Sequence, residues 1–164
     1  MCKPLCACLI ACIFLLFASS LQAQDDVIKL QSCDGNPYQQ TVDSLKKAYA
    51  EQGFIVLREA SFKMESEYEM PVVLPMQAGT IYQFVFIGDP TSKLYEVRMY
   101  DWTERQVVYK RNQWGDIDGN IISYSYVPQA TEYHMIKPVQ VNKKKKELCG
   151  YVMLFKKPQP TAQR

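Results

Sequence analysis

Short runs of alternating apolar and polar residues, each ended by a turn-forming residue, fill the sequence from Gly53 onward. Residues 62–69 alternate in this way, and a period of two places one set of side chains on each face of a β-strand. Residues 80–87 are apolar on both faces, which predicts a central strand. Residues 70–75 carry two prolines, which predicts an edge strand or a bend. Such runs at regular spacing are typical of a sandwich or a jelly roll.

One helix is predicted ahead of the strands, over residues 41–52. Thr41 can cap its first turn, an apolar stripe follows at helical spacing, and Gly53 favours termination. We therefore expect a mainly β, single-domain antiparallel β-sandwich, jelly-roll-like, with one N-terminal helix. We expect residues 142–146 to form a hairpin loop between the last two strands. The predicted strands cover residues 54–58, 62–69, 70–75, 80–87, 94–102, 106–110, 121–127, 133–136, 139–141 and 148–155.

The first 23 residues differ in kind from the rest. Lys3 is the only charged residue before Asp25, and residues 5–17 are all apolar. A positive start, an apolar core and a small residue before a polar stretch are typical of a secretory signal peptide. The apolar run is shorter than the roughly 20 residues that cross a bilayer, so we predict cleavage after Ala23 and no membrane helix afterwards. The protein is then secreted or periplasmic.

The remainder divides into three predicted parts: an extended lead-in over residues 24–40, the sandwich domain with its helix over 41–157, and a flexible tail over 158–164. Without residues 1–23 the chain keeps 18 of its 19 basic residues and all 17 acidic ones, a net charge of +1. That balance provides no general attraction for nucleic acid. A hydrophobic content of 48% excludes a disordered chain.

Six cysteines are distributed unevenly. Four lie within residues 1–23, where residues 9–12 resemble a lipobox, but the apolar core continues past Cys12 and this favours cleavage after Ala23. Cys33 and Cys149 remain. In an oxidising compartment an isolated pair is most simply a disulfide. The alternative is a free nucleophilic thiol, for which the neighbouring residues provide no activating group.

The middle of the chain resembles a known family. Gly79 followed by residues 82–89, and then residues 94–101 with 106–108, is similar to the central strands of bacterial pre-peptidase C-terminal domains. The resemblance covers residues 70–155 and implies a small jelly-roll-like sandwich that serves as an accessory module on secreted enzymes. The chain departs from the family in lacking a catalytic domain and in having the helix and the cysteine pair. It also resembles small secreted Bacteroidetes proteins, and no functional residue is carried over from either.

Residues 116–120 form the sharpest local motif. Asp116, Asp118 and Asn120 supply oxygen ligands at a spacing found in calcium loops. The motif lacks the downstream Glu of an EF-hand, and Asp-Gly and Gly-Asn are also common turn formers. We therefore expect no cofactor, with calcium at these three residues as the alternative.

Aromatic residues provide the candidate ligand-binding site. Sugar rings stack on exposed aromatic faces, and aromatics also dominate protein interfaces and sandwich cores. Parity places Tyr124 and Tyr126 on the same face of their strand. The candidate site consists of Tyr100, Trp102, Trp114, Tyr124 and Tyr126.

Catalytic and polyanion-binding motifs are less favoured. His134 is the only histidine, and no nucleophile elbow, zinc pair or phosphate loop is present. A pocket that holds His134 beside a carboxylate and a hydroxyl would favour an enzyme. Lys143–Lys146 could contact anionic groups, but lysines at a turn are more often solvated.

We therefore expect an exported, non-enzymatic binding module whose partner at the cell envelope is a glycan or a protein. Two alternatives remain: a small secreted hydrolase or calcium-dependent accessory domain, and a structural component of an envelope assembly, which an exposed edge strand would favour.

Overall fold

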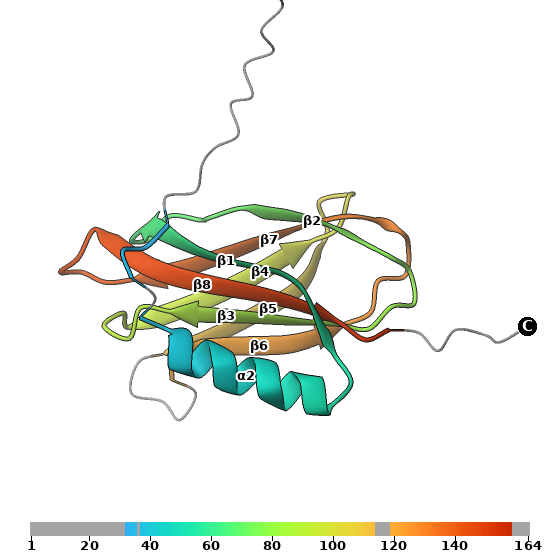
Figure 1. Cartoon of the computed structure of the whole chain (residues 1–164). Coiled ribbons are helices and arrows are strands. Elements are labelled where there is room, and N and C mark those ends of the chain that lie inside the picture. The colour runs from blue at the N-terminus through green and yellow to red at the C-terminus, as the bar shows by residue number, and fades with distance from the viewer. Residues whose placement is uncertain (1–31, 36, 114–118, 159–164) are drawn as a thin grey trace, which may run out of the picture.

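Two four-stranded antiparallel sheets face each other in the computed structural model, which describes residues 32–35, 37–113 and 119–158 (Figure 1). Sheet A has the strand order β1-β8-β3-β6 and sheet B the order β2-β7-β4-β5. The elements are α2 (Gln39–Glu51), β1 (Ile55–Glu65), β2 (Val72–Met76), β3 (Tyr82–Gly88), β4 (Leu94–Tyr100), β5 (Gln106–Gln113), β6 (Ile121–Tyr126), β7 (Glu132–Val141) and β8 (Glu147–Lys156).

The connectivity is that of a jelly roll. The chain changes sheet between most successive strands, and β4–β5 is the one consecutive pair joined by hydrogen bonds within the described residues. The predicted sandwich is therefore confirmed. The predicted hairpin at residues 142–146 is wrong, because β7 belongs to sheet B and β8 to sheet A. Neighbours in sequence face each other across the core in this fold instead of pairing.

The core has two layers. One apolar cluster fills the space between the sheets, and a second lies between α2 and the outer face of sheet A. This explains why β3 is buried along its whole length, as predicted for residues 80–87. Val42 of α2 is 1% exposed, and burial of one such side chain contributes about 1.5–3 kcal/mol.

No helix of the described residues covers the outer face of sheet B, which carries a chain of alternating charges instead. Glu69 accepts from Lys137 at 2.8 Å and from Arg98 at 3.1 Å, and Arg98 also reaches Glu96. Arg111 completes the chain at 3.5 Å from Glu96. Because these charged groups form ion pairs with one another, they suit a sheet face that is in contact with water.

Element boundaries differ from expectation for local reasons. α2 begins at Gln39 with Tyr38 as its N-cap residue, so the predicted cap Thr41 lies inside the helix. The predicted runs 54–58 and 62–69 form one strand, β1, interrupted by a register shift between Val56 and Arg58. Gly53 ends the helix turn with φ of +82°, a conformation that favours glycine.

β7 is longer than predicted because its proline is tolerated. The carbonyl of Pro138 accepts from the N–H of Met70, so the ring nitrogen faces the side on which β2 begins only at Val72. The pairing of β7 with β4 runs through Pro138 without a shift, and the predicted runs 133–136 and 139–141 join into one strand.

Candidate functional site

The β4–β5 turn, the β6–β7 loop and the β2–β3 loop lie at one end of the sandwich, opposite the β7–β8 turn (Figure 1). Adjoining hollows at this end are lined by residues 101–106 and 126–135. Loops on a rigid sandwich are common places for ligand binding. This end therefore holds the candidate site.

Asp101 fixes the β4–β5 turn. Its Oδ1 accepts from the backbone N–H groups of Thr103 and Arg105, both at 3.0 Å, and from the Thr103 hydroxyl at 2.7 Å. Its Oδ2 accepts from the Arg105 guanidinium at 3.0 Å. The Thr103 hydroxyl bond, with the bonds from Arg105, holds the pKa of the Asp101 carboxyl below its usual range.

Trp102 protrudes from this turn. The residue is 71% exposed, and its ring centroid lies 6.2 Å from that of Tyr133, which is 53% exposed. We call this pair the aromatic platform. Val73 and Met135 are exposed beside it and are register partners on β2 and β7. A contiguous exposed apolar surface with two aromatic rings is typical of a binding site.

A solvent-open hollow of about 660 Å³, with both polar and apolar walls, adjoins the platform. It is open to solvent at the mouth of the sandwich, and its walls offer carboxylate, guanidinium, amide and hydroxyl groups for hydrogen bonding. The lining residues are Asp101, Thr103, Arg105, Gln106, Val107, Tyr126, Val127, Gln129, Ala130 and Glu132.

His134 lies beneath this cavity wall. Its Nε2 is 3.2 Å from the Tyr126 hydroxyl and 3.7 Å from Glu132 Oε1. The imidazole is fully buried, and Nδ1 has no hydrogen-bond partner among the described residues. The grouping of histidine, carboxylate and hydroxyl that would favour an enzyme is thus present, but the imidazole has no exposed surface. Burial raises the pKa of the Tyr126 hydroxyl, which disfavours its use as a nucleophile.

The predicted ligand-binding residues separate. Trp102 and Tyr126 line hollows at the site, and the Tyr100 hydroxyl donates to Gln106 Oε1 at 3.3 Å on the cavity wall. Tyr124 is 7% exposed and packs against Phe84 in the core, so its ring is not available for stacking. Trp114 lies outside the described residues.

Tyr133 and Glu132 were not in the predicted site. Tyr133 alternates with His134 in β7, so burial of the histidine places the tyrosine on the outer face. The alternation of inward and outward side chains along this strand could have identified Tyr133 from the sequence. The proximity of the β4–β5 turn to β7 depends on the sheet order, which no local pattern contains.

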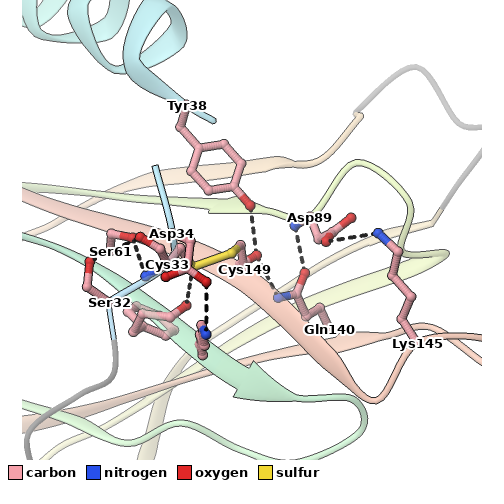
Figure 2. The surroundings of a disulfide bond; sticks show 11 residues. Ser32, Cys33, Asp34, Tyr38, Ser61, Asp89, Gln140, Lys145 and Cys149 are labelled. Carbon is pink, nitrogen blue, oxygen red and sulfur yellow. Dashed lines mark hydrogen bonds and ion pairs between the residues drawn. A yellow bond between two sulfur atoms is a disulfide. The ribbon is translucent and has the colours of Figure 1, made fainter. Parts of the chain in front are cut away.

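The opposite end is held by the confirmed disulfide between Cys33 and Cys149 (Figure 2). The hydroxyl of Tyr38 donates to the Cys149 carbonyl at 2.8 Å, and Gln140 Nε2 donates to the same oxygen at 2.9 Å. Gln140 is completely buried, and its Oε1 accepts from the Asp89 N–H at 2.7 Å. These bonds join the two sheets, α2 and the β3–β4 loop.

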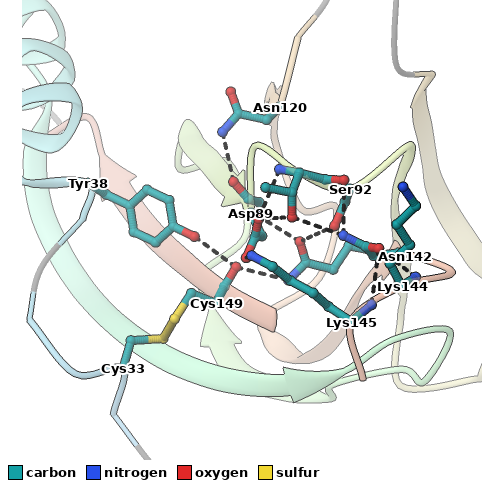
Figure 3. A network of polar contacts seen from close by, with 12 residues as sticks. Cys33, Tyr38, Asp89, Ser92, Asn120, Asn142, Lys144, Lys145 and Cys149 are labelled. Atoms are coloured by element: carbon teal, nitrogen blue, oxygen red, sulfur yellow. Dashed lines mark hydrogen bonds and ion pairs between the residues drawn. A yellow bond between two sulfur atoms is a disulfide. The ribbon is translucent and has the colours of Figure 1, made fainter. Parts of the chain in front are cut away.

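Asn142 orders the lysine-rich turn at this end (Figure 3). Its Oδ1 accepts from the backbone N–H groups of Lys144 and Lys145, and its Nδ2 donates to Thr91. Lys143–Lys146 are exposed, and Lys145 lies 3.8 Å from Asp89. The exposed carboxylates Glu65, Glu67 and Glu147 lie in or beside the strands at the base of this turn. They offset the lysine charges, so the turn offers little net attraction for a polyanion.

Only part of the predicted calcium motif can be placed. Asp116 and Asp118 lie outside the described residues, and Asn120 Nδ2 donates to the Gly88 carbonyl at 2.7 Å. Within the described ranges, no group of three or more histidine, cysteine or acidic side chains is arranged to hold a metal ion. In the same ranges, no helix combines the length and hydropathy of a membrane span.

Comparison with known proteins identifies no family: no protein-family model matches the chain, and no curated protein does. Its structural likenesses are distant. A chain of the Gap123 glycosylation-associated complex of Streptococcus agalactiae matches with a TM-score of 0.36 and 12% identity, over 63% of this chain and 39% of that one. A protein from Bacillus endospore appendages, which are described as disulfide-linked pili, matches with a TM-score of 0.33 and 12% identity. The match covers 63% of this chain and 87% of that one. A tomato aspermy virus protein matches with a TM-score of 0.34 and 10% identity, over 76% of this chain and 98% of that one.

Proposed function

We propose that this protein is a non-catalytic binding domain that acts outside the cytoplasm and that its ligand is a glycan. The observation that carries the proposal is the exposure of Trp102 and Tyr133 as neighbouring rings beside a hollow with both polar and apolar walls. Sugar rings present apolar faces and a rim of hydroxyls. A stacking surface next to fixed hydrogen-bonding groups matches both features.

The glycan is favoured over a protein partner by the make-up of the cavity. Gln129, Glu132 and Arg105 supply planar polar groups within one hollow of about 660 Å³. A pocket of that size suits a small ligand, whereas a stable protein interface needs an extended complementary surface. The predicted export signal and the disulfide between Cys33 and Cys149 are consistent with work at the cell exterior.

The test is a printed array of bacterial and plant oligosaccharides probed with the chain lacking residues 1–23. The best glycan is then titrated calorimetrically against variants. Trp102→Ala and Tyr133→Ala should each weaken binding about tenfold or more, since loss of roughly 1.4 kcal/mol of contact energy changes a dissociation constant tenfold.

Tyr68→Ala is the matched control. Tyr68 is 64% exposed but belongs to the β1–β2 loop at the other end of the sandwich. It should bind as tightly as the unmodified chain. An array without any bound glycan contradicts the proposal, and so does equal affinity of the Trp102 and Tyr68 variants.

A further inference from the structure

A second, smaller hollow lies directly at the aromatic platform. It measures about 210 Å³, and Val73 and Met135 supply its apolar wall. Binding pockets for whole ligands are commonly about 300–1,000 Å³. This hollow therefore suits a single substituent of a ligand whose remainder lies in the adjoining cavity.

Acidic side chains predominate at this hollow. Asp101 and Glu104 line it, its lining residues include no lysine or arginine, and Arg105 lies alongside, paired with Asp101. Asp101 is already engaged by Arg105 and by the turn, with 6% of its side chain exposed. The Glu104 side chain has no hydrogen bond or ion pair among the described residues, so its carboxylate is available to a ligand.

The aromatic rings also favour a positively charged group of the ligand. The π-systems of Trp102 and Tyr133 are negative at their faces, and a cation within about 6 Å of a ring centroid is attracted to them. The rings are tilted by 47° to each other. A positive group in the hollow that both rings and Glu104 line would lie near the two aromatic faces and the carboxylate. A neutral hydroxyl would gain less, and an anion would be repelled.

The backbone of Glu104 also has an unusual conformation. Its φ is +61°, in the left-handed region, and this last position of a three-residue hairpin turn is one that glycine usually occupies. A glutamate there costs stability relative to glycine. A residue in this conformation that also lines a hollow is consistent with a role in binding.

We propose that the hollow between Trp102 and Tyr133 binds a positively charged group of the ligand, an amine or a quaternary ammonium, with Glu104 as its counter-ion. This inference rests on the proposed function in taking the ligand to be a glycan, which would then carry an amino or choline-type substituent.

The test uses a small cation and its neutral isostere, choline and 3,3-dimethyl-1-butanol. Each is titrated into the ¹⁵N-labelled chain while the indole N–H signal of Trp102 is followed by NMR, with Trp102→Phe identifying that signal. Choline should shift the signal with at least tenfold higher affinity than the alcohol. Glu104→Gln should reduce the affinity for choline to that for the alcohol.

Glu67→Gln is the control, because Glu67 is the other non-glycine residue with positive φ among the described residues, at +74°, and is exposed at the far end. It should bind choline like the unmodified chain. Equal affinity for choline and the alcohol, no shift with either probe, or an unchanged Glu104→Gln variant overturns the inference.

The two proposals fail separately. If choline does not bind but Trp102→Ala loses an array glycan, the charge preference is wrong and glycan binding stands. If choline binds through Glu104 but no glycan binds, the proposed cation site is supported and the proposed glycan ligand is wrong. Among array glycans, glucosamine oligomers should bind more tightly than the same oligomers in N-acetylated form, since acetylation removes the charge.

Discussion

At the scale of single residues, Asp101 connects the fold with the site. Its four accepted hydrogen bonds fix the turn that presents Trp102 and Glu104. A carboxylate accepts such bonds more strongly than a neutral amide or acid does. The geometry of the aromatic platform therefore depends on the ionised form of one buried side chain.

Asp101→Asn should make the protein less stable at pH 7, and the difference should close in acid. The pKa of Asp101 is lowered in the folded protein from its ordinary value of 3.8. A depressed pKa contributes stability that is fully present above that ordinary value and is lost as pH falls through the folded-state value. Melting temperatures from pH 7 down to pH 2 measure this. A gap between variant and parent that stays constant over that range contradicts it.

Asp34→Asn is the comparison variant. The Asp34 side chain is 97% exposed and has one ion pair at 3.3 Å. Surface pairs of this kind contribute little. Its melting temperature should therefore follow that of the parent at every pH.

Residue-level prediction succeeded where parity alone was needed. Tyr124 and Tyr126 do share a face, as the strand period requires. Parity does not say which face meets the solvent, and here the shared face is the inner one, so Tyr124 packs against Phe84. Trp102 is exposed because it stands in a turn of three residues, where its side chain has no core to reach.

At the scale of elements, the sequence predicts strand type better than strand partner. Residues 80–87 were correctly assigned to a central strand, because apolar residues on both faces are a local signal. For residues 70–75 the prolines predicted an edge strand or a bend, and β2 is an edge strand. The crossing of residues 142–146 from sheet B to sheet A has no such local signal in the sequence. The helix start was missed because Tyr38 has no side-chain cap, and its burial at 4% exposure positions that end instead.

The disulfide is the strongest single constraint on the elements at the N-terminal end. It closes a separation of 116 residues and ties the segment before α2 to β8. Cys33→Ser/Cys149→Ser should lower the free energy of unfolding by about 4 kcal/mol, mainly because the unfolded chain regains loop entropy. Urea denaturation measures the change.

Secondary structure should survive this double substitution, since α2 is also held to sheet A by its own apolar cluster. The far-UV circular dichroism of the folded variant should match that of the parent. Reduction should add two hydrogens to the mass of the parent and none to the variant. Equal urea midpoints for parent and variant would show that the crosslink contributes nothing to stability.

At the scale of the whole molecule, buried tyrosines connect nearly every layer. Tyr38 links α2 to β8, Tyr95 and Tyr124 lie between the sheets, and Tyr151 lies under the helix. Burial raises the pKa of each phenol, to about 12 for Tyr95 and Tyr151 and further for the other two. The folded protein therefore keeps protons that the unfolded chain releases near pH 10.

Alkaline unfolding should follow from this difference. A raised folded-state pKa contributes stability that is fully present below pH 10 and is lost as pH rises through the folded-state values, so the melting temperature should fall steeply between pH 10 and 12. Absorbance at 295 nm should report the ionisation of these phenols together with unfolding. Tyr124→Phe isolates the contribution of one tyrosine, because its hydroxyl has only a weak contact at 3.7 Å with the Met99 sulfur. That variant should lose less stability than the parent over the same pH range, since it has one phenol fewer to ionise on unfolding. Parallel curves for the two proteins would contradict a contribution of the buried Tyr124 phenol to alkaline unfolding.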